Sequence, residues 1–313
     1  MSRRLSLVLC ASLALGLAGP VEAQQLRDLR SDPDAPIVVS GSRSPREQVR
    51  DRAVEFVRQI GVARGQQAAA RWLDPVCPRV LGIADPYSGI VEQRMRAIAA
   101  EIGMLVAPED CRTNVSVSFV GDAEALMREI DRRSPTRLQE VPVDVRDALI
   151  DGDAPIRWWY LTETRSRHRM RNAPQAVETT HGGIGGTGGR SAESSPALEV
   201  ESLTEYNSSI ISTYGVRAII DANVVIDLDR VEGMALEAIA AYAAFVAFVE
   251  VRTGDPRAPG SILGIFSTDP DTRSLTQWDM TFLRSLYRLP LDRSSRRHRG
   301  TLVRDLVNAQ TPG

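Results

Sequence analysis

The three histidines are the first candidates for chemistry, because imidazole binds zinc readily and titrates near neutral pH. His168, His181 and His298 lie far apart in the 313-residue chain, and none has a second histidine four residues along. A zinc site needs ligands at short spacing on rigid elements. We therefore interpret all three as solvent-exposed side chains and predict neither a metal site nor a cofactor.

Residues 183–188 (GIGGTG) fit the glycine spacing of a dinucleotide-binding loop. That loop needs a strand before it and a helix after it, so that the helix N-terminus meets the pyrophosphate. Polar segments flank this run instead. The chain also contains no lysine, since all 38 basic residues are arginine, which excludes a Walker A loop and Schiff-base catalysis. We interpret the glycine run as part of a linker.

Carboxylates are the remaining candidates for acid–base catalysis. Glu237 is the one charged residue within a long apolar stretch and is a weak candidate catalytic group. Asp221, Asp227 and Asp229 lie in and just after a β-rich run. Paired carboxylates can act as general acid and base. Aspartates at a strand end are also typical of turns and caps, which is the alternative interpretation.

Arginines concentrate near the C-terminus, at positions 293, 296, 297, 299 and 304. The net charge of −2 gives no general basic field, so we predict no nucleic-acid partner. The cluster could hold an anionic component of the cell envelope. Alternatively, Asp292 and Asp305 make it an ordinary solvated helix face.

Residues 1–23 have the features of a secretory signal peptide: Arg3 and Arg4, a short apolar run, and a small-x-small cleavage site at 21–23. Residues 24–43 then form a proline-interrupted linker. We expect a periplasmic or secreted protein whose mature chain has no transmembrane helix. An uncleaved signal holding a structural module at the membrane is the alternative.

Cleavage would leave two cysteines, Cys77 and Cys111. An even cysteine count in an exported protein indicates a disulfide. The bridge lies within a predicted N-terminal α+β unit, residues 44–164. The elements of this unit include a helix capped by Ser44, a helix opening at 85–86 with Ile90 on its apolar face, and a strand at 114–120.

Residues 165–200 are rich in glycine, serine and arginine, and predict a flexible loop. Residues 201–313 complete the same α+β domain. Within them, residues 233–249 are apolar on nearly every side but too short to span a bilayer. The predicted fold is therefore a mixed sheet packed on a buried central helix.

Three segments of the C-terminal third resemble an exported proteobacterial family of unknown function that is similar to zincin-type metallopeptidases. They follow the apolar helix and comprise 261–266 (SILGIF), 275–279 (LTQWD) and 282–287 (FLRSLY). The resemblance covers roughly residues 200–290 and implies a zincin-like core.

The zinc-binding motif of the zincins is missing from this chain. In an HExxH register only Glu237 matches, because Leu236 and Ala240 occupy the histidine positions and Val246 the third ligand position. The resemblance thus implies a degenerate zincin-like core. We expect a non-catalytic protein that binds an unidentified envelope or extracellular ligand. The alternative is a metal-independent hydrolase that uses carboxylates near Glu237.

Overall fold

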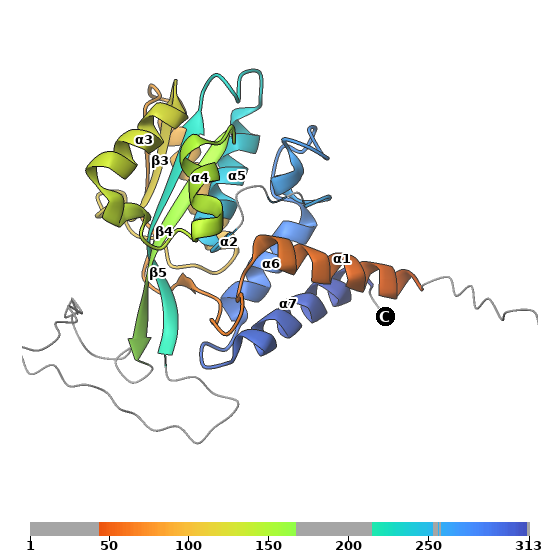
Figure 1. Ribbon diagram of the computed structural model, residues 1–313. Helices are drawn as coiled ribbons and strands as arrows, with labels where there is room; N and C mark the ends of the chain where they lie inside the picture. Colours follow the sequence, from red (N-terminus) through yellow and green to blue (C-terminus); the bar gives the residue numbers. More distant parts are fainter. Residues whose placement is uncertain (1–43, 167–214, 253–255, 257, 312–313) are drawn as a thin grey trace, which may run out of the picture. The chain divides into compact units, whose positions relative to one another are not determined.

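The structure is a computed structural model that describes residues 44–166, 215–252, 256 and 258–311 (Figure 1). All described elements belong to one compact unit. The predicted signal peptide, the 24–43 linker, the glycine run, His168 and His181 lie outside the described residues, as does most of the predicted 165–200 loop.

A mixed five-stranded sheet lies at the centre of this unit, with β5 as its longest strand. One edge of β5 pairs in parallel with β1 and β3, and β2 pairs in parallel beyond β3. The other edge pairs antiparallel with β4. The strands are β1 (Arg71–Trp72), β2 (Pro78–Leu81), β3 (Val115–Val120), β4 (Ile156–Ser166) and β5 (Gly215–Asp227). Arg165 and Ser166 therefore belong to β4, and the expected loop does not begin at residue 165.

Seven α-helices surround the sheet within the described residues (Figure 1). α3 and α4 lie over one sheet face, where Trp159 and Val225 are buried. α2 and α5 lie over the other face, where Trp158 and Val224 are buried. The helices are α1 (Pro45–Ile60), α2 (Tyr87–Glu101), α3 (Ala123–Arg133), α4 (Val143–Asp151), α5 (Leu236–Phe248), α6 (Gln277–Arg288) and α7 (Ser295–Gln310). The mixed sheet and α+β class agree with the prediction.

The local sequence signals set most helix boundaries. Ser44 caps α1 and forms the expected capping box with Glu47, and Gly61 ends the helix at φ +75°. The prediction that Ile90 lies on the buried face of α2 is wrong, because its side chain is 44% exposed. Val91 and Met95 are buried instead. One residue rotates the position by about 100° around a helix, which places Ile90 outside the buried stripe.

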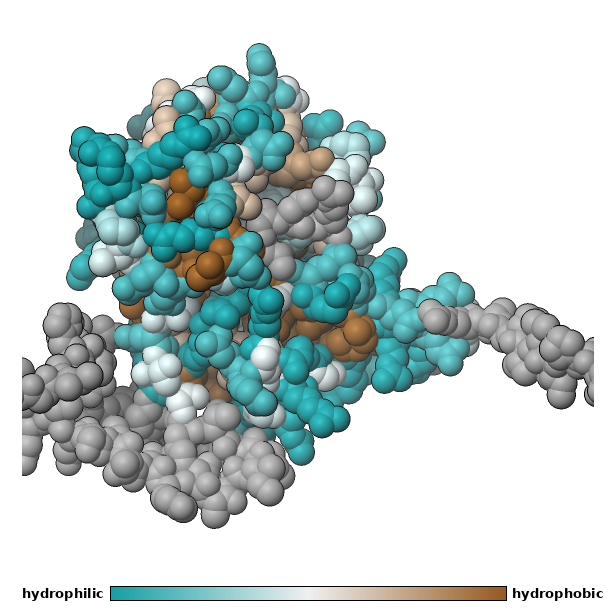
Figure 2. Space-filling model, in the orientation of Figure 1, coloured by the Kyte–Doolittle hydropathy of each residue, from teal (hydrophilic) through white to brown (hydrophobic). Residues whose placement is uncertain are grey.

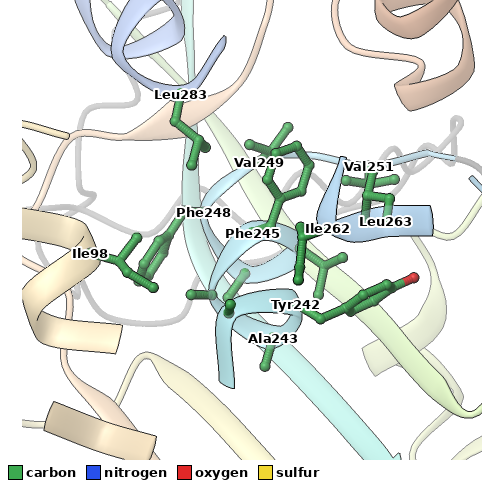
Figure 3. Close-up of a cluster of buried hydrophobic side chains, with 14 of the residues drawn as sticks. Ile98, Tyr242, Ala243, Phe245, Phe248, Val249, Val251, Ile262, Leu263 and Leu283 are labelled. Carbon is green, nitrogen blue, oxygen red and sulfur yellow. The ribbon is translucent and has the colours of Figure 1, made fainter. Parts of the chain in front are cut away.

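α5 is the buried central helix that the sequence predicts. Every residue from Ala238 to Phe248 is buried, and Figure 3 shows Phe245 and Phe248 of this helix among side chains from other elements, including Ile98 and Leu283. No helix in the described part of the chain is long and apolar enough to cross a membrane.

Four aromatic side chains satisfy the polar backbone where α5 ends inside the core. Trp72 Nε1 donates to the Ala247 carbonyl at 2.9 Å, and Tyr287 Oη donates to the Phe248 carbonyl at 2.8 Å. Tyr160 Oη shares its one proton between the carbonyls of Val246 and Val249, and Trp158 Nε1 donates to that of Val251. The last carbonyls of a helix have no partner within the helix, so these donors allow α5 to end without water.

The segments that carry the family resemblance have a structural role, centred on Asp279. This buried carboxylate accepts hydrogen bonds from Ser261 Oγ and from the Ile262 and Thr276 backbone N–H groups. It therefore joins the 3₁₀ turn η3 (Ile262–Gly264) to the N-terminus of α6. The serine, threonine and aspartate of these segments are thus explained by packing and capping.

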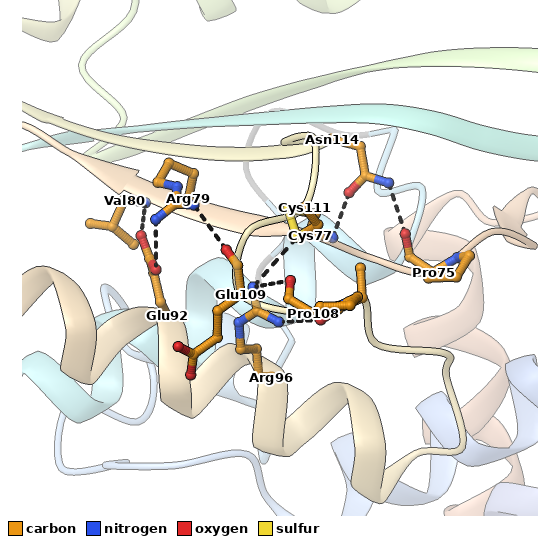
Figure 4. Close-up of a disulfide and its surroundings, with 11 residues drawn as sticks. Pro75, Cys77, Arg79, Val80, Glu92, Arg96, Pro108, Glu109, Cys111 and Asn114 are labelled. Atoms are coloured by element: carbon orange, nitrogen blue, oxygen red, sulfur yellow. Dashed lines mark hydrogen bonds and ion pairs between the residues drawn. A yellow bond between two sulfur atoms is a disulfide. The ribbon is translucent and has the colours of Figure 1, made fainter.

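The predicted disulfide joins Cys77 to Cys111, with 6.0 Å between their Cα atoms. Figure 4 shows the polar contacts that surround it. Arg96 of α2 donates to the Ala107 carbonyl at 2.6 Å, and the Asn114 side chain joins the Cys77 N–H to the Pro75 carbonyl. The segment after α2 is thereby fixed against β2 and β3.

Candidate functional site

Glu237 lies in the first turn of α5, and its side chain is exposed. It forms no ion pair with the described residues. Ala240 and Val246, at two of the positions where a zincin would carry metal ligands, are buried in the core. Within α5, Glu237 is the only carboxylate.

The three aspartates near the end of β5 are also separate. Asp227 is buried and accepts hydrogen bonds from the N–H groups of Ala123 and Arg230, which makes it a cap for α3 and for the turn after β5. Asp221 accepts from Asn223 Nδ2, and partial burial raises the pKa of its carboxyl. Asp229 is exposed in the turn. Capping explains Asp227 better than catalysis does.

His298 is buried, so the prediction of a solvated histidine is wrong here. Its Nδ1 accepts the Ala69 backbone N–H at 3.1 Å, which leaves the proton on Nε2, 2.9 Å from the Pro290 carbonyl oxygen. Burial lowers the pKa of this imidazole. α7 turns His298 inward because Leu302 and Leu306, one and two turns later, belong to the same buried stripe.

No group of three histidine, cysteine, aspartate or glutamate side chains in the described ranges is arranged to hold a metal ion. A largely buried charge cluster in these ranges is structural. Arg217 forms two 2.7 Å contacts with the buried carboxylate of Glu250, which also pairs with Arg252 Nε at 3.0 Å. This cluster connects β5 to the segment that follows α5.

A groove of about 730 Å³ lies between α1 and α7, and we call it the α1–α7 groove. Six arginines and no acidic residue line it, and valines form its apolar part. In Figure 2 a hydrophobic patch lies over these helices, bordered by hydrophilic side chains. The arginines are Arg46, Arg50, Arg58, Arg64, Arg299 and Arg304, and the valines are Val54, Val57, Val62, Val303 and Val307.

The two helices of the groove run antiparallel (Figure 1). Arg46, at the start of α1, donates to Asn308 Oδ1 near the end of α7 at 3.3 Å. Arg299, at the start of α7, donates to the carbonyls of Ala63 and Gly65 just beyond α1. Beneath the groove, Phe56 packs edge-on against Trp278 of α6, with 5.6 Å between ring centroids. The scaffold of the groove is thus a three-helix cluster.

Acidic residues outside the groove neutralise part of the positive charge of its arginines. Glu55 pairs with Arg58, Asp144 with Arg64 at 3.5 Å, and Asp305 with Arg304 at 3.1 Å. These pairs are solvent-exposed, and exposed ion pairs contribute only about 0 to 1 kcal/mol each. An incoming anion can therefore compete for the guanidinium groups.

The sequence identified Arg299 and Arg304 as part of a basic cluster, and the structure adds four arginines from α1 and the turn after it. Arg293, Arg296 and Arg297 do not line the groove. The missed signal was the helical spacing of Arg46, Arg50 and Val54, which places all three on one side of α1.

The chain matches no protein-family model, no curated protein and no solved structure. The α1–α7 groove therefore has to be interpreted from its own residues.

Proposed function

We propose that this chain is an exported, non-catalytic binding protein with a degenerate zincin-like core, and that the α1–α7 groove binds an anionic ligand with an apolar portion. One observation carries the proposal: six arginines surround a valine floor, and no carboxylate lines the same surface.

The two kinds of lining residue select for two properties of a ligand. Guanidinium groups form bidentate contacts with carboxylates and phosphates. Among the lining valines, Val54 and Val303 keep exposed area, and a ligand that removes this area from water is stabilised by about 25 cal/mol per Å². Val54 is 48% exposed and offers such area directly. A purely inorganic anion would leave the exposed apolar area of Val54 and Val303 in water, and a neutral hydrocarbon would form no ion pair with the arginines.

Binding at the periphery is consistent with the closed core. The residues of α5 from Ala238 to Phe248 are buried, and the polar backbone at its end is occupied by aromatic donors. Glu237 is exposed and forms no ion pair with the described residues. No observation therefore favours the alternative hydrolase.

Calorimetric titration of the protein with decyl phosphate, below the concentration at which it aggregates, tests the ligand class. We expect decyl phosphate to bind more tightly than inorganic phosphate or neutral decyl maltoside, and its affinity to fall as salt rises. Arg50→Glu together with Arg304→Glu should weaken binding at least tenfold. The matched control is Arg297→Glu, on an exposed residue of α7 outside the groove. Equal binding of decyl maltoside, or equal loss in the control, would refute the proposal.

Two further measurements address export and the degenerate core. The mature protein from its native host should begin at Gln24, as the proposed cleavage site requires. Purified protein should contain no stoichiometric zinc. One zinc per chain would contradict the proposed loss of the metal site.

A further inference from the structure

We propose that the occupant of the α1–α7 groove is an amphipathic helix of a partner protein, with carboxylates at both ends of an apolar stripe. This inference rests on the proposed function and specifies its ligand. It follows from how the charges and the valines are distributed along the groove.

The arginines form two separate sets, one at each end of the antiparallel helix pair. Arg46 and Arg50 begin α1 and share their end of the groove with Arg304 and Asn308 of α7. Arg58 and Arg64 lie at the other end, with Arg299. Val54 and Val57 of α1 and Val303 of α7 lie between the two sets, whereas Val307 lies beside Asn308.

The distance between the two sets is too large for one anionic group. Arg50 and Arg58 are eight residues apart on α1, which corresponds to about 12 Å along the axis, and Arg46 and Arg58 to about 18 Å. A single phosphate or carboxylate cannot contact both Arg46 and Arg58 across the larger separation. A ligand that uses both sets needs two anionic positions, with an apolar segment between them.

An amphipathic helix can provide two anionic positions with an apolar segment between them. Carboxylates 7 or 11 residues apart lie within about 20° of the same side of a helix, about 10 to 17 Å from each other, and apolar residues between them form a stripe. Such a helix lies along the groove between two existing helices, as amphipathic helices do in apolar grooves of binding proteins. It would complete a layer over α1 and α7.

The position of the valines argues against a flat membrane surface as the occupant. Val57 and Val307 are only 2% and 6% exposed, below the exposed Val54 and the arginines around it. A planar bilayer would contact the arginines at the rim and leave the groove of about 730 Å³ unfilled. A convex side-chain ridge of a helix can enter it.

The test uses the full chain and fluorescently labelled 18-residue peptides, with binding measured by anisotropy. One peptide carries two glutamates at each end of a leucine–alanine stripe, and its isomer carries all four glutamates at one end. We expect the first to bind at least tenfold more tightly than the isomer. Arg50→Glu and Arg58→Glu should each weaken its binding at least tenfold, and Arg297→Glu less than twofold.

Charge exchange provides a second readout that misfolding cannot imitate. A peptide with lysines in place of the glutamates at one end should bind Arg58→Glu and not Arg50→Glu. A peptide with lysines at the other end should bind Arg50→Glu and not Arg58→Glu. This pattern would also fix the orientation of the helix.

The remaining outcomes separate this inference from the proposed function. Equal binding of both peptides would overturn the two-ended occupant. Binding of decyl phosphate or of phosphatidylglycerol vesicles without binding of either peptide would overturn the helix and keep an anionic ligand at the groove. If decyl phosphate, the vesicles and the peptides all fail to bind, both proposals are wrong.

Discussion

Tyr160→Phe should destabilise the protein through the backbone at the end of α5. The Tyr160 hydroxyl shares its one proton between the carbonyls of Val246 and Val249, the latter at 2.7 Å, and accepts the Val251 N–H at 3.1 Å. All these contacts are buried. Phenylalanine keeps the ring and removes only the hydroxyl, so the effect reports hydrogen bonding rather than packing.

The expected magnitude follows from which backbone groups keep a partner. The Val251 N–H also donates to the Val249 carbonyl at 2.8 Å, so these two groups remain satisfied. The Val246 carbonyl loses the side-chain donor that Tyr160 provides. Leaving one buried polar group unsatisfied costs about 1 to 3 kcal/mol, and we expect the free energy of unfolding to fall by about 2 kcal/mol.

Urea unfolding at pH 7, followed by tryptophan fluorescence with the disulfide intact, measures this loss. The midpoint should fall while the slope m stays unchanged, because the surface exposed on unfolding is the same. Tyr287→Phe removes one donor, to the Phe248 carbonyl, and should cost about 1 kcal/mol. Tyr87→Phe is the control, since Tyr87 is 56% exposed, and should change stability by less than about 0.5 kcal/mol. If Tyr160→Phe behaves like Tyr87→Phe, the donors do not stabilise α5.

Three other predictions use the same unfolding assay. Burial lowers the pKa of His298, so as pH falls the unfolded chain becomes protonated at this histidine before the folded chain does. Stability should therefore fall as pH drops below 6.5, by at most about 1.4 kcal/mol per pH unit. His298→Asn should flatten this dependence of stability on pH between pH 7.5 and 5.5. Replacing Cys77 and Cys111 with alanine should cost about 3 to 4 kcal/mol, given their sequence separation of 34; an unchanged urea midpoint would show that the bridge adds nothing. Glu237→Gln should shift stability by less than about 0.5 kcal/mol, because Glu237 is exposed, and a larger loss would reveal a partner.

The elements with strong local signals were predictable from the sequence. The Ser44 capping box and Gly61 define α1, and the alternation around Val117 defines β3. These signals depend on residues a few positions apart, and the structure confirms them. The burial of α5 followed in the same way, because a helix that is apolar on all sides has no stable place at the surface.

His298 shows where local reasoning fails. A histidine among arginines is usually exposed, and the adjacent Arg297 and Arg299 suggested the same here. Its hydrogen-bond partner is the backbone N–H of Ala69, 229 residues away. Only the packing of α7 against the segment after α1 creates that partner, and no pattern within either segment encodes it.

The α1–α7 groove was also unpredictable from local patterns, because it forms only where α1 and α7 pack side by side. Arg50 and Val54 lie on the side of α1 away from Phe56, which packs into the core against α6. In α1 alone they look like ordinary residues of a solvated helix face. α7 places a second such face beside the first. The arginines of both helices then surround shared valines, and their exposed acidic neighbours do not line the groove. The proposed affinity for anions therefore depends on both helices, and replacing residues on either helix should affect it.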